Sequence, residues 1–106
     1  MKSSVKINDI SNLPVPVDQL PLPEILDVIK DFKKTDFFKK YVDKVYVTLD
    51  SLMADTIYFL PKNGYGVPEY TIQELKSVSD ALDREQFMFE HIGYASDLGL
   101  KLYEVK

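Results

Sequence analysis

The sequence predicts an α+β domain, a two-layer sandwich in which helices pack on one face of a small, mostly antiparallel sheet of three or four strands. Three observations lead to this fold class. Residues 45–49 and 56–60 have the alternation, or the β-branched and aromatic content, that strands favour. Residues 24–43 and 71–98 carry apolar side chains at the three- and four-residue spacings of amphipathic helices. Residues 100–105 alternate again, so the last helical segment leads into a terminal strand.

The size and composition of the chain are those of one ordinary globular domain. With 106 residues, of which 45% are hydrophobic, it can bury its own core, and we expect a single domain over residues 1–106. It has no Cys, which excludes disulfides, a thiolate nucleophile and Cys-based zinc sites. It also lacks a signal-peptide core and an apolar run long enough to span a membrane. We therefore expect a cytoplasmic protein without membrane association.

The N-terminal part of the chain predicts little regular structure. Weak alternation over residues 3–10 permits a short first strand. A proline-rich connector follows at about residues 11–23, where four prolines fix the backbone, remove hydrogen-bond donors and exclude a central strand or a helix. The apolar residues between the prolines favour packing onto the protein's own core over service as a docking peptide.

The first helical region begins after Pro23, a residue that suits the first turn of a helix. Its apolar face consists of Ile25, Val28, Ile29 and Phe32. The pattern breaks at Thr35 or Asp36, either of which can cap a second helix whose apolar stripe is formed by Phe38, Tyr41, Val42 and Val45. Whether residues 24–43 form one kinked helix or two short ones stays open at this level.

The two strand-like segments predict a hairpin. Residues 45–49 and 56–60 are separated by six residues, and we expect them to pair in antiparallel fashion. Pro61 ends the second strand because proline supplies no backbone donor, and the Asn-Gly pair that follows is a strong turn signal. If the terminal strand, residues 100–105, lies beside the first strand of this hairpin, it occupies the middle of the sheet.

The C-terminal third contains the clearest local motif. Thr71 and Glu74 have the spacing of a capping box, which starts a helix with the apolar stripe Leu75, Val78 and Leu82. Asp83 and Gln86 repeat that spacing, so we expect a second helix with a core face formed by Met88, Ile92, Ala95 and Leu98. Gly99 then ends this helix in a left-handed conformation.

Several classes of functional site are excluded. The four glycines fit neither the phosphate-binding loop nor the dinucleotide fingerprint, and a single imidazole, His91, rules out a two-His metal site within one chain. We therefore expect neither a metal ion nor a cofactor. The enzyme-class alternative is a small hydrolase or small-molecule-binding protein, in which Glu85 or Asp97 orients His91 as a general base. The position of His91 at the edge of the expected core stripe favours a structural role and a non-catalytic protein.

Charge is unevenly distributed along the chain, whose net charge is −4. Residues 30–44 hold six Lys against three Asp, whereas residues 69–106 hold eight acidic against four basic residues. The acidic total, and the absence of Arg from the basic stretch, disfavour direct binding of nucleic acid. That alternative would use lysines interleaved with aromatic residues: Lys33, Lys34, Lys39 and Lys40.

The acidic half of the chain supports a protein-binding hypothesis instead. Tyr is common at interfaces, and an acidic helix face steers basic partners. We expect a small acidic module that binds a basic, nucleic-acid-binding protein, as an inhibitor, an immunity-type protein or a phage-type antagonist does. Whether it acts as a monomer or a homodimer stays open. The expected partner-binding residues are Asp80, Asp83, Glu85, Glu90, Asp97, Tyr65, Tyr70 and Tyr94.

Overall fold

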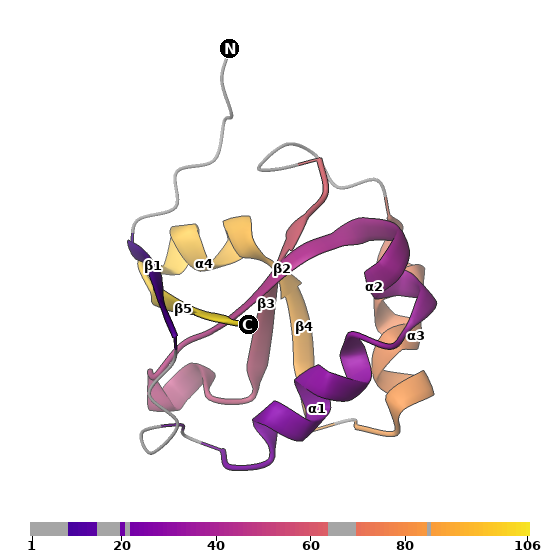
Figure 1. Ribbon diagram of the computed structural model, residues 1–106, viewed down its shortest axis with the longest axis horizontal. Coiled ribbons are helices and arrows are strands. Elements are labelled where there is room, and N and C mark those ends of the chain that lie inside the picture. Colours follow the sequence, from indigo (N-terminus) through magenta and orange to yellow (C-terminus); the bar gives the residue numbers. More distant parts are fainter. Residues whose placement is uncertain (1–8, 15–19, 21, 64–69, 85) are drawn as a thin grey trace.

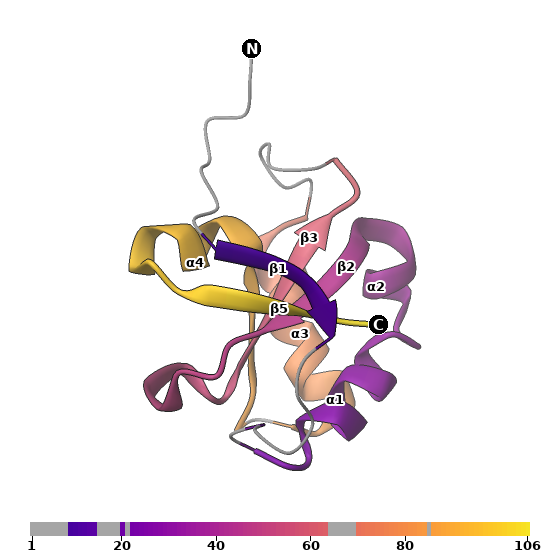
Figure 2. The ribbon, with the colours of Figure 1, turned by 60° about the vertical axis from the view of Figure 1, so that its left-hand side comes forward.

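The protein forms one mixed β-sheet with helices packed against it (Figures 1 and 2). The computed structural model describes residues 9–14, 20, 22–63, 70–84 and 86–106, with side chains from position 20 onward except at 96 and 97. The predicted α+β class is confirmed. Within the described residues the sheet has five strands rather than three or four, and it combines two antiparallel with two parallel pairings.

The strand order across the sheet is β1-β5-β2-β3-β4. β5 therefore lies between β1 and β2, in agreement with a terminal strand inside the sheet, and β4 forms one edge. The elements in chain order are β1 (Asp9–Pro14), α1 (Ile25–Phe32), α2 (Asp36–Tyr41), β2 (Val42–Val47), the 3-10 helix η2 (Ser51–Met53), β3 (Thr56–Pro61), α3 (Ile72–Leu82), β4 (Met88–His91), α4 (Ile92–Leu98) and β5 (Lys101–Val105).

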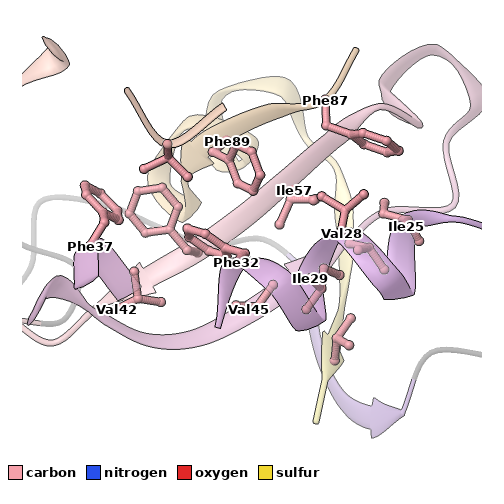
Figure 3. Packing of buried hydrophobic residues seen from close by; sticks show 14 residues of the cluster. Ile25, Val28, Ile29, Phe32, Phe37, Val42, Val45, Ile57, Phe87 and Phe89 are labelled. Atoms are coloured by element: carbon pink, nitrogen blue, oxygen red, sulfur yellow. The ribbon is translucent and has the colours of Figure 1, made fainter. Parts of the chain in front are cut away.

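The larger hydrophobic core lies between the sheet and the helices α1, α2 and α3 (Figure 3). Phe32 is central to it, since its ring centroid lies 4.7 Å from that of Phe89 and 6.2 Å from that of Phe59. The predicted apolar face of α1 is confirmed, because all four of its members are buried. The Tyr41 hydroxyl donates a 2.8 Å hydrogen bond to the Glu74 carboxylate and thereby joins α2 to α3.

A second, smaller core lies on the opposite face of the sheet, next to α4. Successive side chains of a strand point to opposite faces, so Val45 and Val47 reach the larger core while Tyr46 reaches the smaller one. The helices are therefore divided, three on one face and α4 on the other, because β2 and β3 are apolar on both sides. The buried members of the smaller core are Tyr46, Tyr58, Ile92, Ala95, Leu100 and Leu102.

The predicted hairpin is confirmed: β2 and β3 are antiparallel, with Val45 opposite Phe59. β2 also pairs antiparallel with β5, whereas β1 and β4 lie parallel to β5 and β3. β1 extends into the predicted proline-rich connector and ends at Pro14. An edge strand tolerates proline because its outer side needs no backbone N–H donor for pairing with another strand. The first strand expected over residues 3–10 overlaps β1 only at its end, and positions 3–8 lie outside the described residues.

Residues 24–43 form two helices followed by the start of a strand, which decides the alternative left open by the sequence. Thr35 caps α2, because its hydroxyl oxygen accepts a 3.1 Å hydrogen bond from the amide of Phe38. The prediction that the apolar stripe of this helix continues through Val42 and Val45 is wrong, since β2 begins at Val42. β-branched side chains pack well on a sheet surface, and these valines are buried there.

Residues 71–98 contain one confirmed helix start and one error. The Thr71 hydroxyl accepts a 3.0 Å hydrogen bond from the Glu74 amide, and the Glu74 carboxylate accepts a 3.2 Å hydrogen bond from the Thr71 amide, so the capping box is confirmed. Asp83 starts no second helix; it ends α3 with a φ of 55°. Residues 88–91, expected in that helix, form β4 instead, and α4 begins only at Ile92.

The error at β4 comes from two competing periodicities in one short stretch. Phe87 and Phe89 are buried in the larger core, whereas Met88 between them is exposed, which is the two-residue period of a strand. The three- and four-residue spacing of a helix applies only from Ile92, where Ile92 and Ala95 are buried as expected. Leu98, the last member of that expected core face, is 47% exposed, so its assignment to the core is wrong.

Gly99 follows α4 with a φ of 69°, in the left-handed conformation that its position predicted. We expect Gly99→Ala to lower the free energy of unfolding by about 1 kcal/mol, because an added Cβ meets open space but strains the backbone. Gly99→Asn is the control and should cost less, since Asn adopts this conformation more readily. Urea unfolding followed by circular dichroism measures both losses, and equal losses would contradict the backbone explanation.

Candidate functional site

The helix α3 and the edge strand β4 are neighbours in the fold (Figure 1). Side chains of both elements line an open groove. Its volume is about 320 Å³. Two of its apolar side chains are largely exposed, Ile72 at 85% and Met88 at 50%. Large apolar side chains that line a surface groove and remain in water mark an interaction site. Its main lining residues are Ile72, Leu75 and Lys76 from α3 and Met88, Phe89 and Glu90 from β4.

Local structure explains why these side chains lie there. The Thr71 cap fixes Ile72 as the first residue of α3, while Val78 anchors the opposite side of that helix in the core. In β4, Phe87 and Phe89 fix the strand against the larger core, while Met88 and Glu90 alternate with them and lie at the free edge, where they also line the groove. The groove is therefore a consequence of how α3 and β4 pack onto the core.

The backbone of β4 is asymmetric. The Met88 amide donates a 2.8 Å hydrogen bond to the Asp55 carbonyl, which directs the polar groups of Met88 and, two residues on, of Glu90 toward β3. The polar groups of successive strand residues point in opposite directions, so both polar groups of Phe89 and the N–H of His91 face the outer edge. The His91 carbonyl instead accepts the first hydrogen bond of α4. Among the described residues no strand pairs with that edge.

The groove itself is lined by one acidic side chain, Glu90, and one basic side chain, Lys76. Asp80 and Asp83, on and just after α3, are exposed, and Glu90 on β4 is half-buried. Burial raises the pKa of the Glu90 carboxyl above its usual value, because the charged form loses hydration there. Of the nearby cations, Lys76 lines the groove and Arg84 lies 3.6 Å from Asp31, on α1.

Three of the predicted partner-binding residues lie on α3, directly after it and on β4: Asp80, Asp83 and Glu90. Of these three, Glu90 lines the groove. Tyr94 is 48% exposed but belongs to α4, on the opposite face of the sheet. Tyr65 and Glu85 lie outside the described residues, as does the side chain of Asp97 on α4.

Tyr70, also predicted as a surface contact, instead packs against the larger core. Its ring centroid lies 5.2 Å from that of Phe37 and 5.5 Å from that of Phe59. Burial, and then the charge of Glu90, raises the pKa of its phenol to about 12. Tyr70 is therefore a packing residue with one partly accessible side.

The geometry of His91 does not suit a general base. Its Nδ1 accepts a 2.8 Å hydrogen bond from the Gly93 amide, so the neutral ring carries its proton on Nε2. Nε2 is buried and has no hydrogen-bond partner within the described part of the chain. Burial lowers the pKa of the imidazole, which keeps it neutral at pH 7. With one nitrogen occupied as an acceptor and the other protonated, His91 has no free lone pair for a substrate.

The four lysines of the nucleic-acid alternative do not form one free cluster. Lys33 donates a 3.4 Å hydrogen bond to the carbonyl of Val105, and the Lys40 ammonium lies 5.2 Å from the centroid of the Tyr41 ring. Lys34 and Lys39 are exposed. Two of the four cations are thus already engaged within the protein.

Sequence reasoning did not find the apolar part of the site. Ile72 follows a capping residue and precedes the buried stripe of α3, and Met88 stands between two buried phenylalanines. Both signals are present in the sequence, but the second requires β4 to be recognised as a strand.

Other classes of site are not evident. Within the ranges that the structure describes, no group of three His, Asp or Glu side chains could hold a metal ion. No helix in those ranges is long and apolar enough to cross a membrane. Comparison with protein families, with curated proteins and with solved structures gives no match to this chain.

The raised pKa of Glu90 gives a test by pH. A folded-state pKa above the unfolded value means that stability is lost as pH rises through the folded pKa. We expect Glu90→Gln to be more stable than the wild type at neutral pH, where only the wild type buries a charge. Below the unfolded pKa, both side chains are neutral and the difference should vanish. Thermal unfolding at the two pH values measures this, and a difference that grows toward acid pH would contradict it.

Proposed function

We propose that this chain is a non-catalytic protein-binding module that uses the groove between α3 and β4 to bind a partner with a basic surface. One observation carries the proposal: Ile72 and Met88 remain exposed at a groove that the half-buried Glu90 carboxylate also lines. A partner that covers these two side chains would gain the free energy of burying their apolar surface.

The acidic side chains supply the specificity of the proposed interaction. Asp80 and Asp83 are exposed, so they steer a basic partner and speed its association more than they add to final affinity. Glu90 is half-buried at the groove itself, where pairing with a cation offsets its lost hydration. The proposed contact thus combines an apolar centre with a charged periphery, the usual arrangement of a protein interface.

The partner class that fits this surface is a protein that itself binds nucleic acid, because such proteins expose lysines and arginines to phosphates. An inhibitor, an immunity-type protein or a phage-type antagonist that occupies such a target would present a surface of this kind. Since the chain has no Cys and needs no oxidising compartment, we assign this activity to the cytoplasm. The hydrogen-bonding state of His91 offers no support for the enzyme alternative.

Selection of random displayed peptides on the immobilised full chain tests the proposal. We expect enrichment of sequences that combine Lys or Arg with apolar residues. Asp80→Lys should weaken the selected peptides by about tenfold at low salt, and less at high salt, because salt screens exposed charges. Asp43→Lys, which changes an exposed acid on β2, is the matched control and should have little effect. Titration calorimetry with the synthetic peptides gives the affinities.

The contribution of the apolar side chains to peptide affinity is tested with a second variant and its matched control. Ile72→Ser should also weaken the same peptides by about tenfold, because it removes apolar area from the contact. Leu52→Ser is the control, since Leu52 is 87% exposed on η2, against 85% for Ile72 on α3. This function would be refuted by a selection that enriches no peptides, or by peptide affinities that neither Asp80→Lys nor Ile72→Ser changes.

A further inference from the structure

We infer that the partner enters as an extended segment that adds a strand to the outer edge of β4, with apolar side chains toward α3 and a basic side chain beside Glu90. This inference rests on the proposed function and specifies the form of its partner.

The backbone of β4 provides the first support. The register Ile57 to Phe89 and Phe59 to His91, together with the Met88 amide bound to the Asp55 carbonyl just before β3, directs both polar groups of Phe89 and the N–H of His91 outward. The His91 carbonyl precedes α4 and accepts the first hydrogen bond of that helix. Outward N–H and C=O groups on an edge strand are a template for another strand, and this is how several peptide-recognition domains bind extended ligands.

The two edges of the sheet differ in their suitability. β1 ends at Pro14, a residue without an N–H donor. β4 contains neither Pro nor Lys, the residues with which edge strands often block pairing, and it has the groove along α3 beside it. β4 is only four residues long, so backbone pairing there is brief and side-chain contacts must supply much of the affinity.

The two faces of an added strand would meet different surroundings. Residues opposite Phe89 would point to the side of α3, where Ile72 and Leu75 offer apolar contact. Residues opposite Glu90 would point to the other face, where its carboxylate is half-buried. Because a strand alternates its side chains between faces, the fitting segment alternates apolar residues with Lys or Arg.

Glu90 also argues against a second copy of this chain as the occupant. Antiparallel pairing of two β4 strands would place two half-buried Glu90 carboxylates at one junction. Like charges at a strand pair are destabilising, whereas a basic segment neutralises them. The charge of this edge therefore selects against self-association and in favour of a basic strand.

Backbone N-methylation of a synthetic peptide tests strand addition directly. The probe is a capped peptide of alternating Val and Lys, prepared unmodified, with N-methyl groups on all Val, or with N-methyl groups on all Lys. Alternate amides of a strand point to opposite edges, so one methylated form should lose binding by about tenfold or more and the other should keep it. In the complex, hydrogen exchange of the Phe89 and His91 amides of the full chain should slow by about tenfold or more.

Charge selection by Glu90 is tested with the same probe and with a peptide of alternating Val and Glu. The Lys peptide should bind at least about tenfold more tightly, and Glu90→Gln should reduce this preference. Glu104→Gln is the matched control, because Glu104 is also half-buried and lies opposite a buried tyrosine, Tyr46, but on the interior strand β5. Circular dichroism verifies that both variants fold.

The outcomes separate the two proposals. Basic peptides that bind equally well with either set of N-methyl groups, without protecting Phe89 and His91, would overturn strand addition and leave the binding function intact. Failure of the Lys peptide, together with failure of the random-peptide selection, would overturn the binding function itself. Protection of the same two amides without peptide, together with a dimer in sedimentation, would identify a second copy as the occupant and refute the basic segment.

Discussion

The fold depends above all on the burial of β2 and β3 from both sides. Val45 and Ile57 face the larger core, while Tyr46 and Tyr58, the next residue in each strand, face the smaller one, and all four are at most 3% exposed. Strands that are apolar on both faces cannot leave either face in water, so other elements of the chain must cover both faces of the sheet. The helices α1, α2 and α3 cover one face, and the short α4 covers part of the other.

The need to cover both faces of the sheet explains why the candidate site includes β4. To reach the second face, the chain must cross the sheet after α3, and β4 makes the crossing as a short edge strand that leads directly into α4. Phe87 and Phe89 anchor it in the larger core, and Ile92 anchors the next element in the smaller one. Met88 and Glu90 alternate with these anchors, and this alternation gives the edge both an exposed apolar residue and a half-buried acid.

The polar groups near this edge are tuned by burial more than by ion pairs. Tyr58, opposite Glu90 in the register, is fully buried, and burial followed by the Glu90 charge raises the pKa of its phenol to about 12. The same loss of hydration raises the pKa of the Glu90 carboxyl and lowers the pKa of the His91 imidazole. Both shifts disfavour the charged form, so a cation that paired with Glu90 would offset part of its lost hydration.

The sequence by itself determined the features that depend on neighbours a few residues apart: the apolar face of α1, the Thr71–Glu74 capping box, the β2–β3 hairpin and the left-handed Gly99. It did not show that Glu90 lines the groove, that Tyr94 lies on the opposite face of the sheet or that Tyr70 packs on the larger core. The tertiary structure decided that β5 enters the interior of the sheet, that residues 88–91 form a strand, and that Ile72 and Met88 line one groove. The physical reason is the separation in sequence between the residues that interact. Caps, turns and amphipathic faces are fixed by contacts between residues only a few positions apart. The strand order, and whether residues around Met88 follow the period of a helix or of a strand, depend on which apolar surfaces from distant parts of the sequence must be buried.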